Sequence, residues 1–167
     1  MDINYMKILE GERFRSIGRA SDMCWISFGQ TIKVKDYKGN EKEKGTYALH
    51  LQSPWRIIDQ STEKIIIASS DIYEPNTSLQ WSEEFEWDKM GSNLFDEKVE
   101  KWNNEQDVVY VLSVNANNFG DIEMKFSNDF IFNSFMNMSS DEEGWRFLKC
   151  GSDEHHMIGT GRGIKFE

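Results

Sequence analysis

Apolar and polar residues alternate along much of the first half of the chain. The alternation is clear in residues 31–37 (TIKVKDY) and 46–52 (TYALHLQ), and residues 14–20, 23–29, 55–59 and 64–70 are rich in β-branched and aromatic residues. A period of two places the apolar side chains on one face of a strand. Residues 38–45 (KGNEKEKG) separate two such runs and predict a polar hairpin loop, in which Gly39 and Gly45 supply positive φ angles. Pro54 indicates an edge, a bulge or the end of a strand.

One segment has helical spacing. Phe95, Val99 and Trp102 lie at i, i+4 and i+7 after Ser92, a suitable N-cap residue, and the helix is expected to end near residues 103–106. Strand patterns return in residues 108–115, 121–127, 130–135, 145–150 and 155–167. The sequence therefore predicts a mainly β (α+β) fold: an antiparallel sheet, sandwich or curled barrel of many short strands with one packed helix. No linker-like stretch divides the chain, so we expect a single domain over residues 1–167.

The two halves of the chain resemble each other. SFGQTIKV leads after a hairpin to WRI, and NFGDIEMKF leads after a hairpin to WRF, so that Phe28 and Trp55 are separated by nearly the same number of residues as Phe119 and Trp145. An internal duplication of a hairpin-plus-strand unit would produce this similarity, and so would chance among common β-sequence patterns.

The charge balance narrows the classes of partner. Acidic residues outnumber basic ones 29 to 19 in 167 residues, which gives a net charge of −10. A surface this negative repels phosphate backbones and anionic lipids, so we expect neither nucleic acid nor a membrane as partner. It favours solubility and rapid encounter with a basic protein.

The most unusual stretch is WSEEFEWDK, residues 81–89, which combines three aromatic rings with four carboxylates. As a strand, it would place the rings on one face and most acids on the other, and burial of the aromatic face would explain its composition. Glu83 would then lie among the rings, where a carboxylate needs a partner or solvent. The alternative is an exposed aromatic patch rimmed by acids that binds a partner. The candidate partner-binding residues are Trp81, Glu83, Glu84, Phe85, Glu86, Trp87 and Asp88.

A second group of polar residues could form a cleft. His50 is predicted on the polar face of its strand, and its candidate neighbours carry guanidinium, carboxylate and amide groups. If the strands bring them together, they would suit acid–base chemistry or capture of an anion. Because their spacing matches no known motif, a structural polar network is the alternative. The candidate cleft residues are Arg19, Asp22, His50, Gln52, Arg56 and Asp71.

The remaining motifs point to no metal and no cofactor. CGSDEHH, residues 150–156, collects possible ligands, but it lacks the spacing of metal-binding motifs. GTGRG, residues 159–163, lacks the spacing of a dinucleotide-binding loop. The only cysteines, Cys24 and Cys150, are far apart, which fits a reducing compartment. With no signal peptide or long apolar run visible, we expect a cytoplasmic protein.

Several stretches together, RASDMCWISFG, YALHLQSPWRI, SSDIYEP and GWRFLKCG, resemble a family of small bacterial proteins of unknown function. That family has similar R-A-x-D-M, A-L-H-x-Q-x-P-W-R-I and terminal W-R-F patterns. The resemblance covers most of the chain and implies a stand-alone bacterial domain of the kind found as immunity proteins beside secreted toxins. It assigns no role to the matching residues, which are Arg19, Asp22, Met23, His50, Gln52, Trp55 and Arg56.

Three functions follow as hypotheses. The favoured one is a non-enzymatic protein-binding domain that uses an acidic, aromatic surface to occlude a basic partner, such as a toxin. The second is a small-molecule-binding protein or enzyme with a cleft around His50, Arg19, Asp22 and Arg56. The third is self-association through a sheet edge near Pro54.

Overall fold

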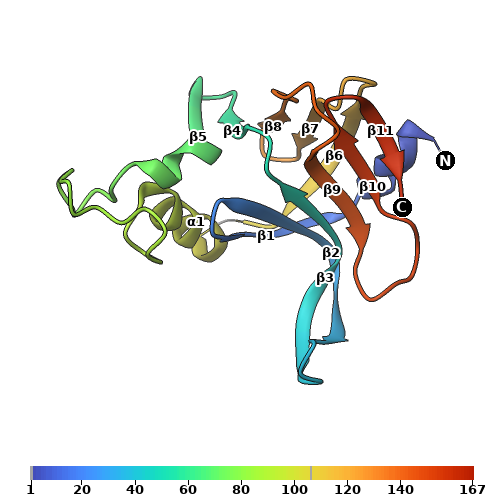
Figure 1. The fold of residues 1–167 in the computed structure, drawn as a ribbon, viewed down its shortest axis with the longest axis horizontal. Helices are drawn as coiled ribbons and strands as arrows, with labels where there is room; N and C mark the ends of the chain where they lie inside the picture. The colour runs from blue at the N-terminus through green and yellow to red at the C-terminus, as the bar shows by residue number, and fades with distance from the viewer. Residues whose placement is uncertain (1, 106) are drawn as a thin grey trace.

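The computed structural model describes residues 2–105 and 107–167, and it is built mainly from antiparallel strands (Figure 1). All strand pairings in the described residues are antiparallel, as expected for hairpin-connected strands. The strands are β1 (Arg13–Ala20), β2 (Met23–Lys35), β3 (Glu41–Leu51), β4 (Trp55–Asp59), β5 (Lys64–Ala68), β6 (Val109–Ala116), β7 (Ile122–Phe126), β8 (Phe130–Ser134), β9 (Glu143–Lys149), β10 (Met157–Thr160) and β11 (Gly163–Phe166). The mainly β prediction is confirmed.

One α-helix, α1 (Leu94–Glu105), packs against β1 with Phe95, Val99 and Trp102 buried, as the apolar spacing predicts. The predicted cap is displaced by one residue: the Asn93 side chain, and not that of Ser92, accepts the backbone N–H of Asp96, at 2.8 Å. Two short 3₁₀ helices complete the helical structure, η1 (Ile3–Leu9) and η2 (Ser69–Tyr73). No helix in the described parts of the chain has the length and apolar character to span a membrane.

The strand order contains an internal symmetry. It runs β11-β10-β9-β3-β2-β1-β6-β7-β8-β4-β5. On each side of the β1/β6 boundary, three consecutive strands are followed by strands from the other half of the chain: β9, β10 and β11 on one side, and the β4–β5 hairpin on the other. β4 leaves the first half to pair with β8, and β9 returns from the second half to pair with β3. A duplicated five-strand unit whose last two strands are exchanged would have this order, with β11 as an additional strand at one edge.

The pairing registers agree with this symmetry. Trp55 in β4 pairs with Ser134, and Trp145 in β9 pairs with Leu51, so the WRI and WRF motifs occupy equivalent positions. Both tryptophans are buried. The comparison of the two halves by sequence is wrong at one position, where it places Phe119 opposite Phe28. Phe119 lies exposed in the turn before β7, and the buried equivalent of Phe28 is Phe126, which has the corresponding place in the strand pairing.

The two halves share one hydrophobic core. Phe14 in the first half makes edge-to-face contacts with Phe28 and with Phe126 from the second half, with ring centroids 5.4 and 5.2 Å apart. The Trp145 indole N–H donates to the carbonyl oxygen of Gly120 at 2.7 Å, which ties β9 to the β6–β7 turn. We call the side of the sheet that faces this core the inner face, and the opposite side the outer face.

The far ends of β2 and β3 extend from the body as a hairpin arm (Figure 1). β3 begins at Glu41, inside the predicted loop, whereas β2 ends at Lys35, two residues before the end of the predicted run. The turn is confined to residues 36–40, where Gly39 has a φ of +81°. Gly45 lies within β3 without a positive φ angle, so its predicted role in the turn is wrong. Pro54 follows the end of β3, and its carbonyl oxygen accepts bonds from the backbone N–H of Phe135 and the Ser134 hydroxyl. The sheet edges are β5 and β11, so of the three alternatives for Pro54 the structure shows the end of a strand and not an edge.

Candidate functional site

Residues 81–89 do not form a strand, which corrects the strand interpretation of this stretch. They belong to a long loop, residues 74–93, that leads from η2 to α1; we call it the acidic loop. Its rings are spaced by two in the sequence, but no neighbouring strand pairs with their backbone. Instead, the side chains of Ser92 and Asn93 within the loop, and that of Arg19 from β1, bond the loop's carbonyl groups, so the backbone follows these contacts and not a sheet.

The loop is closed at its base and braced from within. Pro75 and Asn93 form a β-bridge, and the backbone N–H of Leu94 donates to the Glu74 carbonyl oxygen at 2.8 Å. Further along, the Ser92 hydroxyl lies 2.7 Å from the Glu86 carbonyl oxygen, and the Asn93 amide donates to that of Trp87 at 2.8 Å. These bonds give the loop a defined conformation in the absence of regular secondary structure.

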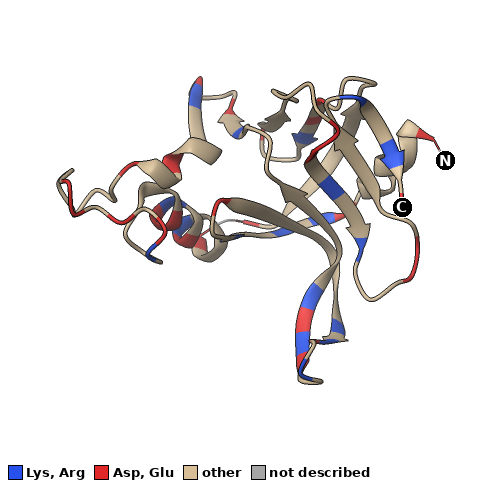
Figure 2. Cartoon of the chain, viewed as in Figure 1, with Lys and Arg blue, Asp and Glu red and all other residues tan. Residues whose placement is uncertain are grey.

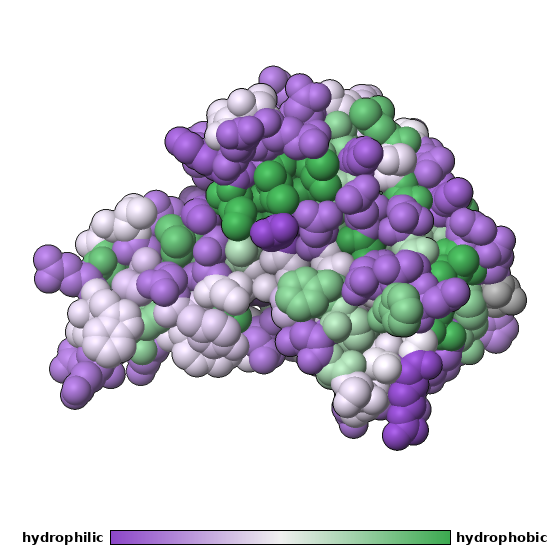
Figure 3. All heavy atoms as spheres, turned by 90° about the horizontal axis from the view of Figure 1, so that it is seen from above, coloured by the Kyte–Doolittle hydropathy of each residue, from purple (hydrophilic) through white to green (hydrophobic). Residues whose placement is uncertain are grey.

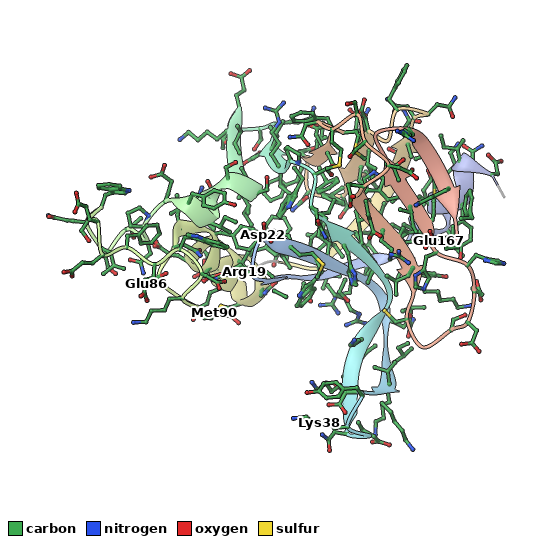
Figure 4. All side chains as sticks on the ribbon, viewed as in Figure 1. Arg19, Asp22, Lys38, Glu86, Met90 and Glu167 are labelled. Carbon is green, nitrogen blue, oxygen red and sulfur yellow. The ribbon has the colours of Figure 1, made fainter. Side chains whose placement is uncertain are left out.

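Arg19 joins the acidic loop to the sheet. Its side chain, of which only 2% is accessible, makes two 2.7 Å hydrogen bonds to the carboxylate of Asp96 at the start of α1. The same guanidinium reaches Asp88 of the loop at 3.4 Å. Burial opposes the ionisation of Asp96, but the bonds from Arg19 and from the Gly91 N–H outweigh it and lower the pKa of Asp96 below its ordinary value. Figure 4 shows Arg19 on the β1–β2 hairpin beside the loop that carries Glu86 and Met90.

The loop exposes apolar surface together with its acids. Trp81 is 69% exposed and Met90 is 70% exposed, while Phe85 and Trp87 are half-buried, the latter against the ring of Tyr73. The carboxylates of the predicted set lie on exposed residues: Glu83, Glu84, Glu86 and Asp88. Aromatic rings and acids therefore share one surface, and the rings are not sealed in the core. In Figure 3 this part of the molecule, at the left, shows pale aromatic side chains among hydrophilic ones.

The charge of the chain is concentrated here. Residues 71–105, which include the acidic loop and α1, hold ten acidic residues and three lysines, so they account for −7 of the net −10. Figure 2 shows these acids at the end of the molecule formed by α1 and the loop. Such a local field attracts cations far more strongly than an even distribution of the same charge.

A groove of about 660 Å³ lies between the acidic loop, α1 and the outer face of β1 and β2. Its apolar lining includes Trp25, Met90 and Val99, and its carboxylates include Glu97 and Glu100. The amide and hydroxyl groups of Thr77 both donate to Glu97, at 2.7 and 2.6 Å, and these bonds lower the pKa of Glu97. Apolar walls with ionised carboxylates suit the aliphatic stem and cationic head of a lysine or arginine side chain.

The predicted polar cleft does not form. Arg19 pairs with Cys24 on the neighbouring strand, whereas His50 pairs with Trp25. Because successive residues of β2 point to opposite faces, Arg19 lies on the inner face and His50 on the outer face.

The remaining cleft residues have separate roles. Asp22 is exposed beside Ser21 in the β1–β2 turn, and Gln52 and Arg56 are exposed at other points of the chain. Asp71 accepts the backbone N–H of Ala68 and forms an ion pair of 3.0 Å with Lys98. His50 instead neighbours Arg146 of β9, a contact that the sequence spacing did not indicate.

The histidine-rich segment is part of an ion-pair network. The Nη1 atom of Arg146 lies 2.9 Å from Nδ1 of His156, and Arg146 also pairs with Glu143 and Glu167. Over residues 2–105 and 107–167, no three side chains of the His, Cys, Asp and Glu types gather as a metal would require. Cys24 is buried, and its burial raises the pKa of the thiol to about 11, which makes it a poor nucleophile.

Comparison of the chain with protein-family models, with curated proteins and with solved structures finds no match.

Proposed function

We propose that this protein binds a basic protein partner through the acidic loop and the adjacent groove, and that it does so without catalysis. The partner would place cationic side chains against the loop's carboxylates and cover Trp81 and Met90. A bacterial immunity protein that occludes a toxin would act in this way, and the two unpaired cysteines favour the cytoplasm as its location.

The observation that carries the proposal is the exposed Trp81 on a braced, strongly acidic loop. Tryptophan is over-represented among the residues that dominate binding energy at interfaces. Holding an indole in solvent costs free energy that burial against a partner would recover. The surrounding carboxylates would accelerate encounter with a cation and make the association depend on salt. Because hydrogen bonds fix the loop beforehand, little conformational entropy is lost on binding.

The proposal is tested by capture from a lysate of the source organism on the immobilised chain, at low and then increasing salt. The loop variant replaces Glu83, Glu84 and Glu86 by glutamine, and a second variant is Trp81→Ala. The control replaces three exposed acids outside the loop by glutamine, so that its net charge equals that of the loop variant: Glu63, Glu123 and Glu142.

We expect a basic protein that elutes with salt and whose capture falls at least tenfold with either loop change and not with the control. The captured protein, once purified, should bind the wild-type chain with an association rate that falls as ionic strength rises. Equal losses of capture in the loop variant and the control would show that the interaction depends on net charge alone and not on the acidic loop. Recovery of no basic protein at low salt would contradict the proposal outright.

A further inference from the structure

A second cavity, of about 580 Å³, lies on the outer face of the sheet at the base of the hairpin arm. Its floor is a row of residues paired across three strands: Ser16 of β1, Ser27 of β2 and Ala48 of β3. The next row, with Trp25 opposite His50, stands higher and forms one wall. The difference in side-chain size between the two rows makes the hollow.

The opposite wall comes from the arm. The β2–β3 register shifts between Phe28 and Thr31, which turns the arm away from the sheet. Gly45 allows this close approach, because a Cβ atom there would lie 2.3 Å from the Ser27 hydroxyl oxygen. Thr31 and Lys44 then face the hollow from the arm, and Leu148 and Cys150 line it on the β9 side. The cavity is thus a consequence of the fold and has a size typical of small-molecule sites.

The lining is rich in unused hydrogen-bond donors. The Nε atom of Arg15 donates to the carbonyl oxygen of Gly29, but its two Nη groups make no hydrogen bond within the described residues. Three further groups of the lining also make no hydrogen bond within the described residues: Nζ of Lys44, the indole N–H of Trp25 and the imidazole of His50. Among the described residues that line this cavity, two are cationic, Arg15 and Lys44, and one is acidic, Glu43, in a chain of net charge −10. Donors without acceptors favour an acceptor-rich, anionic ligand.

The Trp25 side chain forms a flat wall of the cavity. Its indole lies over Gly18, where a Cβ atom would come within 2.1 Å of the ring. The ring is half-exposed, so a second planar group can stack on it. His50 is partly buried beside it, and this burial lowers the pKa of the imidazole despite the opposing charge of Glu143. Near neutral pH the wall therefore adds a neutral ring, while the positive charge comes from Arg15 and Lys44.

We infer that this cavity binds a small planar aromatic carboxylate, with its ring against Trp25 and its carboxylate between Arg15 and Lys44. The inference does not depend on the proposed protein partner: Trp25 lines both the cavity and the groove beside α1, but the acidic loop contributes no residue to the cavity, and Arg15 and Lys44 do not line the groove. No bond is made or broken in this binding.

The test uses indole-3-carboxylate as the probe and indole-3-carboxamide as its neutral match, with the full chain in titration calorimetry and in ¹H–¹⁵N NMR. We expect the carboxylate to bind with a Kd of about 1 mM or tighter and the amide at least tenfold more weakly, since a charge-assisted bond is lost. The indole N–H resonance of Trp25 should shift during the titration. Bound probe should also slow the alkylation of Cys150.

Two variants locate the site. Lys44→Met should weaken carboxylate binding about tenfold, and Ala48→Leu should abolish it by filling the floor of the cavity. Lys33→Met is the control, because Lys33 lies on the same arm, pairs with Glu41 and does not line the cavity. Equal affinities for acid and amide, absence of binding at 10 mM probe, or equal effects of Lys44→Met and Lys33→Met would each overturn the inference. Unchanged probe binding in the Glu83/Glu84/Glu86 loop variant would separate this site from the protein-binding surface.

Discussion

Asp96→Asn tests the energetic role of the contact that attaches the acidic loop and α1 to the sheet. The substitution preserves the shape of the side chain and removes its charge. Asp96 is 9% accessible and holds the buried guanidinium of Arg19 through two bonds of 2.7 Å. An asparagine presents one oxygen and one N–H₂ group, so at least one donor of Arg19 then faces another donor.

The expected loss follows from what Arg19 retains. Breaking a buried ion pair by removal of one partner typically costs about 3–5 kcal/mol, because the other charge stays buried. Here Arg19 keeps the Ser21 carbonyl oxygen at 3.0 Å and the exposed carboxylate of Asp88 at 3.4 Å. We therefore place the decrease in the free energy of unfolding at the lower end, at about 3 kcal/mol. With a urea slope of roughly 2 kcal/mol/M, the midpoint should fall by about 1.5 M.

The assay is urea unfolding followed by circular dichroism and by tryptophan fluorescence. Asp88→Asn is the matched control: it touches the same guanidinium, but its side chain is 63% accessible, so a loss below about 1 kcal/mol is expected. Replacing both Arg19 and Asp96 by methionine and leucine should recover part of the loss, since an apolar pair leaves no charge buried. Equal midpoints for Asp96→Asn and Asp88→Asn would refute the reasoning.

Three further predictions concern pH, packing and thiol reactivity. The pKa of Asp96 is lowered in the folded protein below its ordinary 3.8, so the contribution of this carboxylate to the free energy of unfolding is present above pH 3.8 and is lost as the pH falls through the pKa of the folded state. Urea midpoints should therefore decline more steeply between about pH 5 and pH 2 in the wild type than in Asp96→Asn. Gly159→Ala should destabilise the fold by about 1–3 kcal/mol, because its Cβ would lie 2.2 Å from the fully buried ring of Trp145. Gly18→Ala should cost less stability, because its Cβ meets the half-exposed indole of Trp25, which can swing aside. Equal losses of stability in thermal melts of the two variants would contradict this difference. Cys24, whose burial raises its pKa to about 11, should react with a thiol reagent at pH 8 only at the rate of unfolding. Because Cys150 is a second free and partly exposed thiol, the labelling is followed in Cys150→Ser, where rapid reaction of the native chain would show Cys24 to be accessible.

Periodicity in the sequence was sufficient to predict that the chain forms many strands and one helix. Alternation in β3 and the i, i+4, i+7 spacing of Phe95, Val99 and Trp102 record which side chains face the core, and burial in the structure follows both patterns. The acidic loop shows where this reasoning fails. Its rings have strand-like spacing, but its conformation is decided by hydrogen bonds from Arg19, Ser92 and Asn93, and sequence spacing carries no information about such partners.

The candidate cleft failed for a related reason. Whether Arg19 and His50 share a face depends on pairing register, and a shift of one residue reverses the answer. The register seen here places Cys24 opposite Arg19 and Trp25 opposite His50, which separates the two. The cavity that does contain His50 is lined by Arg15, at the β1 register shift between Phe14 and Ser16, and by Lys44, beyond the β2–β3 shift between Phe28 and Thr31. The alternation pattern of the sequence predicts neither irregularity.

The exchange of β4 and β9 between the two halves has a consequence for how the chain is made. Leu51 finds its neighbour Trp145 only after about ninety further residues have been synthesised, so β3 emerges from the ribosome with one edge unpaired. Such distant pairing slows folding, and it also means that neither half is a self-sufficient folding unit. A backbone cut within the acidic loop would leave two fragments that each lack a hairpin held by the other, and these fragments should regain the native fold only when mixed.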